Sequence, residues 1–160
     1  MTMAYRGIAI TIIHCAIVLS LAGKYALDRE RLPRVWVKTA PYDPTLPIRG
    51  RYVSLRLQVD CATDVYPSGW ISARLEVKNN RLVALPVASG AGIMISGARG
   101  LPWTLTEPVA FFIPEHIEDP SLRPSDEELW VEATVPKSGP PRPLRLGVKK
   151  NGVLTPLDLR

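Results

Sequence analysis

The sequence has little cysteine and little histidine. Two cysteines, Cys15 and Cys61, occur among 160 residues, and they stand far apart in the chain. Cys15 lies inside an apolar run, so we expect no disulfide framework. The two histidines, His14 and His116, are also separated, and no motif surrounds Cys61. This distribution argues against a catalytic site built on histidine or cysteine.

Proline is absent before Pro33, although the chain contains 16 prolines. Formal charge is absent from residues 7–23, GIAITIIHCAIVLSLAG, which Arg6 and Lys24 bound. A helix of that length spans roughly 25 Å, the short end of what crosses a bilayer. Flanking tyrosines at Tyr5 and Tyr25 suit the headgroup zone. The pattern therefore predicts a membrane-spanning helix.

The boundaries of this anchor follow from the same pattern. We expect an N-terminal tail at 1–6 and a transmembrane anchor at 7–27, because the stem of Lys24 can extend the apolar length. A linker at 28–33 is expected to continue the helix until Pro33 stops it. Residues 34–160 then form the second part of the chain.

His14 lies near the middle of the apolar run. A neutral imidazole at that depth can bind a backbone carbonyl or a partner helix. We interpret His14 as a tolerated residue of a short anchor, with contact to another membrane protein as the alternative.

A cleaved signal peptide is the competing interpretation of the N-terminal run. The Ser20-Leu21-Ala22 sequence before Gly23 has the small-x-small pattern of a cleavage site near 22/23. Cleavage would leave a soluble periplasmic domain. The uncleaved anchor is favoured because the run is longer than a typical signal core. The basic residues that follow it, by simple counting, favour a cytoplasmic second part, whereas a long C-terminal domain can translocate regardless of charge.

After Pro33 the hydrophobic pattern changes to a period of two. Nine windows of alternating or apolar residues follow, and two pairs of neighbouring windows are joined at hairpin signals, Asn79-Asn80 and Asn151-Gly152. We expect a mainly β fold, a β-sandwich or small β-barrel of about eight or nine short strands. The windows are 35–38, 53–59, 71–78, 82–87, 92–96, 109–113, 129–135, 144–150 and 153–157.

Charge is unevenly distributed. The formal net charge is +5, but no window resembles a basic reading helix or an aromatic RNA platform, so we expect no nucleic-acid partner. An acidic cluster carries one arginine, Arg123, and no calcium-loop or zinc-helix spacing, so we expect no metal and no cofactor. We expect this cluster to be an exposed loop in electrostatic contact with the basic remainder. Its carboxylates are Glu107, Glu115, Glu118, Asp119, Asp126, Glu127, Glu128 and Glu132.

Residues 38–57, KTAPYDPTLPIRGRYVSLRL, form the most distinctive window. Its turn-forming residues are followed by a strand, and it resembles the signature of the GDYXXLXY family of small bacterial proteins. Two positions depart from that signature, with Arg51 in place of aspartate and Leu57 in place of the final tyrosine. The resemblance covers about the first 60 residues, and residues 112–115 are similar to a later segment of the family. The matching positions are Ala40, Pro41, Asp43, Pro44, Arg49, Gly50, Tyr52 and Leu55.

The resemblance implies a protein of the bacterial inner membrane with a single membrane pass and the β domain on the periplasmic side. It implies a partner, a polytopic membrane protein, and no defined reaction. We therefore expect a binding or assembly subunit rather than an enzyme, and the small-molecule ligand is unknown. A membrane-tethered hydrolase similar to a signal peptidase, using Ser54 with Lys149 or Lys150, is the alternative. The candidate binding residues are Asp43, Arg49, Gly50, Tyr52, Leu55 and Arg56.

Overall fold

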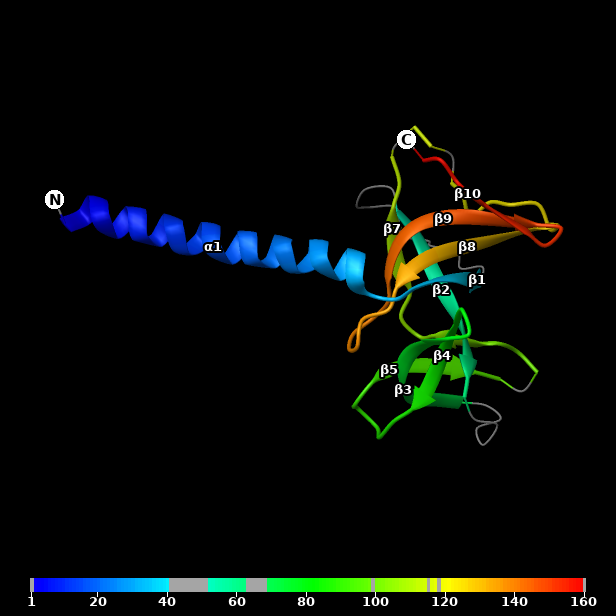
Figure 1. Ribbon diagram of the computed structural model, residues 1–160. Helices are drawn as coiled ribbons and strands as arrows, with labels where there is room; N and C mark the ends of the chain where they lie inside the picture. The colour runs from blue at the N-terminus through cyan, green and yellow to red at the C-terminus, as the bar shows by residue number, and fades with distance from the viewer. Residues whose placement is uncertain are drawn as a thin grey trace. The chain divides into compact units, whose positions relative to one another are not determined.

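The computed structural model describes residues 2–40, 52–62, 69–98, 100–114, 116–117 and 119–159 (Figure 1). The chain divides into two units, Met1–Leu32 and Pro33–Arg160. The first holds one helix and the second holds all the strands, so the fold is mainly β with one apolar helix near the N-terminus, as the sequence predicts.

Helix α1 spans Thr2–Arg31, and within it Gly7–Arg31 is long and apolar enough to cross a membrane. The most apolar window of that stretch has a mean hydropathy of 1.8, and none of it is buried by the rest of the chain. At about 1.5 Å per residue, 25 residues extend roughly 37 Å, longer than a hydrocarbon core. The helix ends just before the Pro33 that we expected to stop it.

The β domain contains ten strands among the described residues, against the eight or nine expected. The additional strand is β6, only three residues long, which is too short to show a period of two. The ranges are β1 Arg34–Ala40, β2 Tyr52–Cys61, β3 Gly69–Lys78, β4 Arg81–Pro86, β5 Ile93–Gly97, β6 Trp103–Leu105, β7 Val109–Phe112, β8 Glu127–Thr134, β9 Arg142–Lys150 and β10 Val153–Pro156.

Strand β2 belongs to two sheets at once (Figure 1). Its first half pairs with β7 and then with β1, and its second half pairs with β6 and with β4. The pairings β2–β4–β3–β5–β6–β2 close a small ring, while β1–β8–β9–β10 continue the other sheet. The β domain therefore combines a closed, barrel-like ring with an open sheet, and β2 belongs to both.

Both predicted hairpin turns are present. Asn79 and Asn80 have φ of 50° and 57° between paired β3 and β4, and Asn151 and Gly152 have φ of 51° and 82° between β9 and β10. Two consecutive positive φ values make the turn that follows the right-handed twist of the strands. Asparagine tolerates this conformation better than most residues because its side chain bonds the local backbone.

The core consists of aliphatic side chains from both sheets. On β2 the inward side chains are Val53, Leu55, Leu57 and Val59, each at most 4% exposed. They pack with Val131 and Leu146 of one sheet and with buried residues of the other in a single cluster. Burial of apolar surface stabilises the folded state by about 25 cal/mol per Å², so this cluster is the main source of stability of the β domain.

A glycine on β9 permits one close contact on the outer sheet face. A Cβ built on Gly147 would lie 2.8 Å from Cζ3 of Trp36 and 3.1 Å from the carbonyl oxygen of Thr155. Any side chain at position 147 would therefore displace the indole ring. The Trp36 ring packs directly on the strand because this position is glycine.

Replacing Leu55 with alanine should lower the free energy of unfolding by about 2–5 kcal/mol, because Leu55 is buried and the cavity would not fill. Leu122 is 80% exposed, so Leu122→Ala should change it by less than about 0.5 kcal/mol. Urea unfolding of the full-length protein in detergent, followed by tryptophan fluorescence, measures both, since all four tryptophans lie in the β domain. Equal losses in the two variants would contradict this core assignment.

Candidate binding surface of the β domain

The predicted binding residues fall into two groups. Asp43, Arg49 and Gly50 lie outside the described residues. Tyr52, Leu55 and Arg56 are all on β2. Tyr52 and Arg56 are half-buried on its outer face, whereas Leu55 points into the core and is 1% exposed. Among these three, the outer-face residues are the ones that a partner can reach.

An aromatic pair lies at the start of β2. Tyr52 pairs in register with Phe112 of β7, and their ring centroids are 6.1 Å apart at 57°. Phe112 is 74% exposed, so one ring of the pair is presented to the surroundings. A tilted aromatic pair with an exposed edge offers large contact area with few rotatable bonds. It is a candidate contact surface, and the Phe112 segment was already singled out in the sequence.

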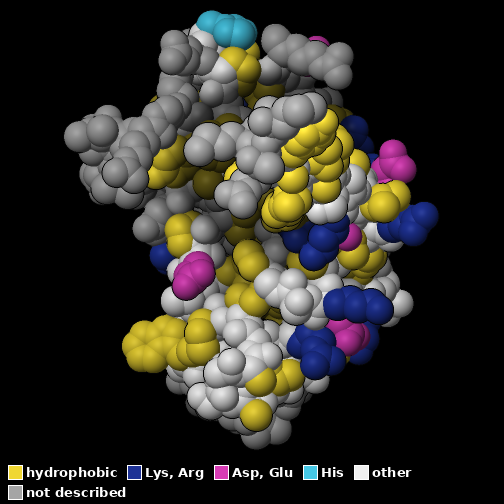
Figure 2. Space-filling view, turned by 90° about the vertical axis from the view of Figure 1, so that its left-hand side faces the viewer, with side chains coloured by type: hydrophobic (Ala, Val, Ile, Leu, Met, Phe, Trp, Pro, Cys, Tyr) yellow, Lys and Arg dark blue, Asp and Glu magenta, His cyan; other side chains and the backbone are white. Residues whose placement is uncertain are grey.

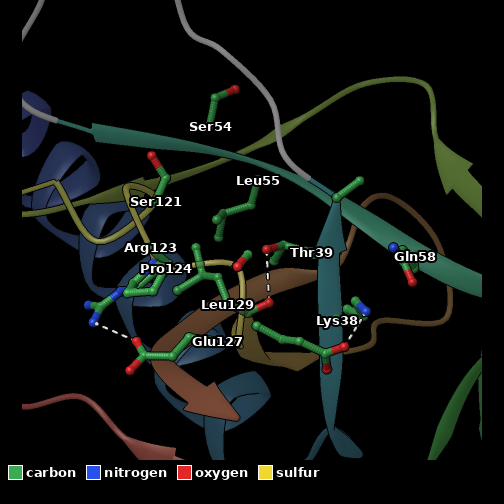
Figure 3. A pocket seen from close by; sticks show the side chains of 13 residues that line it. Lys38, Thr39, Ser54, Leu55, Gln58, Ser121, Arg123, Pro124, Glu127 and Leu129 are labelled. Carbon is green, nitrogen blue, oxygen red and sulfur yellow. Dashed lines mark hydrogen bonds and ion pairs between the residues drawn. The ribbon is translucent and has the colours of Figure 1, made fainter. Parts of the chain in front are cut away.

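A pocket of about 450 Å³ opens between β1, β2 and the chain leading into β8 (Figure 3). Its wall is mixed, with hydroxyl groups, one amide and ion-paired side chains around apolar patches. Thr39 Oγ1 donates a hydrogen bond of 2.9 Å to the carbonyl oxygen of Leu129 and holds β1 to the far wall. The residues labelled in the figure are Lys38, Thr39, Ser54, Leu55, Gln58, Ser121, Arg123, Pro124, Glu127 and Leu129.

Ion pairs occupy the rim of this pocket. Lys38 Nζ donates to Glu128 Oε1, and the indole Nε1 of Trp130 donates to Glu128 Oε2 over 3.0 Å. These two donors, Lys38 first, hold the pKa of Glu128 below its ordinary value of 4.5. The carboxylate of Glu128 is thus charged at neutral pH and accepts two hydrogen bonds, and its role here is structural.

The neighbouring carboxylates are paired in the same way. Lys150 Nζ lies 2.9 Å from Asp126 Oδ2 and 3.3 Å from Glu127 Oε1, and Arg123 contacts Glu127 at 3.5 Å. The hydrogen bond from Lys150 lowers the pKa of Asp126, and the carboxylates of Asp126 and then Glu127 raise the pKa of Lys150. For Asp126, Glu127 and Glu128 the electrostatic contact expected for the acidic cluster is confirmed as an internal one.

The shape of that cluster differs from the exposed loop that we expected. Glu127 and Glu128 belong to β8, where Lys150 of β9 and Lys38 of β1 neutralise them, whereas Glu132 lies in the part of β8 that the window 129–135 predicted. Figure 2 shows one face of the molecule on which basic and acidic side chains lie close together. No group of three or more His, Cys, Asp or Glu side chains that could hold a metal ion occurs within the described part of the chain.

A second pocket, of about 500 Å³, is lined by residues of β1, β2, β4, β8, β9 and β10. Trp36 and Trp130 line it, and a cation lies over each ring, Arg145 at 5.4 Å and Lys149 at 4.7 Å from the ring centroids. Arg145 Nε also donates to Glu132 Oε2 over 2.6 Å. Sequence reasoning missed this surface, although the alternation of Trp36, Lys38, Trp130 and Glu132 on two strands is its signal.

The side chains of the hydrolase alternative are not gathered at one place. Ser54 lines the first pocket, whereas Lys149 and Lys150 are absent from its lining and are engaged by Trp130 and by Asp126. The one lysine of that pocket, Lys38, is bonded to Glu128, and Figure 3 shows it at the opposite end from Ser54. The arrangement can bind polar groups, but among the described residues that line this pocket no base is oriented toward the Ser54 hydroxyl.

Comparison with protein-family models, curated proteins and solved structures finds no match to this chain. Two features carry chemistry that a partner could recognise: the apolar surface of α1 and the aromatic pair on β2 and β7.

Replacing Glu128 with glutamine should lower the free energy of unfolding at pH 7 by less than about 1 kcal/mol, since Lys38 and Glu128 are 39% and 40% exposed. The folded pKa of Glu128 lies below 4.5, so the contribution is present above that pH and is lost as pH falls through the folded value. Urea unfolding at pH 7 and at about pH 3 should show the two proteins differing at neutral pH and converging in acid.

The control is Glu107→Gln, because Glu107 is exposed and forms no ion pair with another described residue. It should leave the stability and its pH dependence unchanged. A Glu128→Gln protein as stable as the parent at pH 7 would show that the ion pair contributes nothing.

Proposed function

We propose that this protein is a single-pass membrane protein whose β domain serves as a binding or assembly subunit for a polytopic membrane protein. The observation that carries the proposal is α1, in which Gly7–Arg31 is long and apolar enough to cross a membrane. The resemblance to the GDYXXLXY family supports a bacterial inner membrane and a β domain on its periplasmic side.

The exposure of the helix supports anchoring on energetic grounds. Its large apolar side chains are between 46% and 70% exposed, and each would lose about 1.5–3 kcal/mol by remaining in water rather than in an apolar phase. Lipid provides that phase over the whole circumference of a helix. These side chains include Ile8, Ile10, Ile12, Ile13, Ile17, Val18, Leu19 and Leu21.

The aromatic pair supports a protein-binding role for the β domain. Interfaces are enriched in tyrosine and phenylalanine, and an exposed ring that packs against a second ring is already held in one orientation. Tyr52 also belongs to the stretch that resembles the GDYXXLXY signature. The hydrolase alternative gains no support, because Lys149 and Lys150 are engaged by other side chains.

Fractionation of the native protein tests the anchoring. We expect the full-length product, 17.7 kDa, in the membrane fraction, and we expect it to resist extraction with alkaline carbonate. Intact-mass measurement distinguishes this from the signal-peptide alternative, in which the N-terminus would be Gly23. A soluble, shortened protein would overturn the anchored form of the proposal.

Purification from solubilised membranes tests the partner. We expect a polytopic membrane protein to copurify, and Phe112→Ala or Tyr52→Ala to reduce its recovery at least fivefold, because each removes half of the aromatic pair. Trp70→Ala is the matched control, since Trp70 is an aromatic residue of the same domain with the same 74% exposure as Phe112. Equal loss with Trp70→Ala, or no loss with the other two, would contradict a contact at this pair.

A further inference from the structure

We infer that His14 marks the face of α1 that binds a helix of the membrane partner, through a hydrogen bond donated by that helix to the imidazole Nε2 atom. This inference rests on the proposed anchoring of α1 in a membrane. It adds the location of the contact and the chemistry of the partner, a side chain that donates a hydrogen bond inside the bilayer.

The tautomer of His14 follows from one contact. Its Nδ1 atom lies 2.8 Å from the carbonyl oxygen of Ile10, one turn earlier in the helix. A carbonyl oxygen only accepts hydrogen bonds, so Nδ1 must carry the hydrogen. In a neutral imidazole the other nitrogen is then an acceptor. Nε2 is therefore a bare acceptor at the end of an exposed side chain.

The two hydroxyl-bearing side chains of the uncharged run donate their hydrogens to carbonyl groups of the same helix. Thr11 Oγ1 donates to the carbonyl of Gly7 over 3.0 Å, and Ser20 Oγ donates to that of Ile17 over 2.8 Å. The Nε2 atom of His14, by contrast, keeps its lone pair free and in this tautomer accepts without donating. Among the described residues of α1, none donates a hydrogen bond to it.

The depth of His14 excludes water as the donor. It lies seven residues from Gly7 and nine from Gly23, which at about 1.5 Å per residue is roughly 10 Å or more from either end of the uncharged run. An imidazole is too short to reach the headgroup zone from there, unlike lysine or arginine. Hydrocarbon offers no hydrogen-bond donor, so the acceptor is satisfied only by another protein segment.

The surface around His14 admits a close neighbour. With about 100° per residue, Thr11 and Val18 lie on the same side of the helix as His14, and Gly7 lies two turns earlier on that side. Nothing lies within 4 Å of the position of a Cβ on Gly7. Small residues at one end of this face allow two helix backbones to approach.

A second copy of this chain does not supply what is missing. In a symmetric parallel pair the two His14 side chains would meet, and each would present an acceptor because each Nδ1 donates to its own helix. The complementary partner is a helix with a hydroxyl, an amide or a protonated carboxyl group at mid-bilayer depth. That description fits a polytopic membrane protein with polar residues in its interior.

Site-directed photocrosslinking in intact membranes tests this inference. A photoreactive residue at position 18 lies about 40° from His14 around the helix, and one at position 19 lies about 140° away. We expect a heterologous adduct from position 18 with at least tenfold lower yield from position 19. The His14→Leu protein should lose the adduct at least tenfold, and His14→Gln, which keeps an acceptor oxygen, should retain it.

Sequencing of the crosslinked peptide should find a transmembrane segment with a hydrogen-bond-donating side chain. An adduct of twice the mass of this chain, equal yields from the two positions, or a yield unchanged in His14→Leu would overturn the inference while leaving the anchoring intact. A chain absent from the membrane fraction would overturn the anchoring itself and this inference with it.

A second measurement keeps the inference testable if His14→Leu fails to accumulate. Full-length protein labelled with ¹⁵N-histidine and reconstituted alone in lipid should show His14 protonated at Nδ1 and unprotonated at Nε2. The His116→Gln variant assigns the signals, since the chain has two histidines. A proton on Nε2 in the isolated protein would remove the unsatisfied acceptor and overturn the inference.

Discussion

The structure of the β domain depends on the two faces and two edges of β2. Its inward side chains Val53, Leu55, Leu57 and Val59 supply the core that both sheets share, and its edges pair with four other strands. A slip of one residue in its register would turn those four side chains to the surface. No neighbouring strand can therefore move along β2 without losing buried area on both sheets.

The register of β2 also determines where the aromatic pair and the first pocket lie. Tyr52 and Ser54 alternate with the core residues, so the register that buries Val53 also places Tyr52 beside Phe112 and Ser54 at the first pocket. The ion-paired wall of that pocket is fixed in a similar way, since Glu128 and its donors come from adjacent strands. The candidate contact surface is thus rigid, which limits the entropy lost when a partner binds.

The sequence was sufficient for local features and insufficient for pairing between distant segments. Alternation and short apolar runs predicted nine of the ten strands, and the asparagine pairs predicted both hairpins. These features depend on residues that are neighbours in the sequence. The pattern missed β6, which three residues cannot reveal, and it treated Glu127 and Glu128 as loop residues because their partners Lys150 and Lys38 lie far away in the chain. Of the candidate site, Tyr52 was foreseen, whereas its contact with Phe112 and the Trp36–Trp130 surface required the fold.

The two units differ in how their spare polar groups are solvated. On the β domain a side chain such as Gln58 or Ser125 can bind water wherever the protein offers no partner. In the membrane-anchored form that we propose, a bilayer would remove that option for α1, so each polar side chain would need a partner in protein. Thr11 and Ser20 have such a partner in the backbone carbonyls of their own helix. His14 has two ring nitrogens and its own helix engages one, so in the proposed anchor the second nitrogen would favour a neighbouring helix that donates a hydrogen bond.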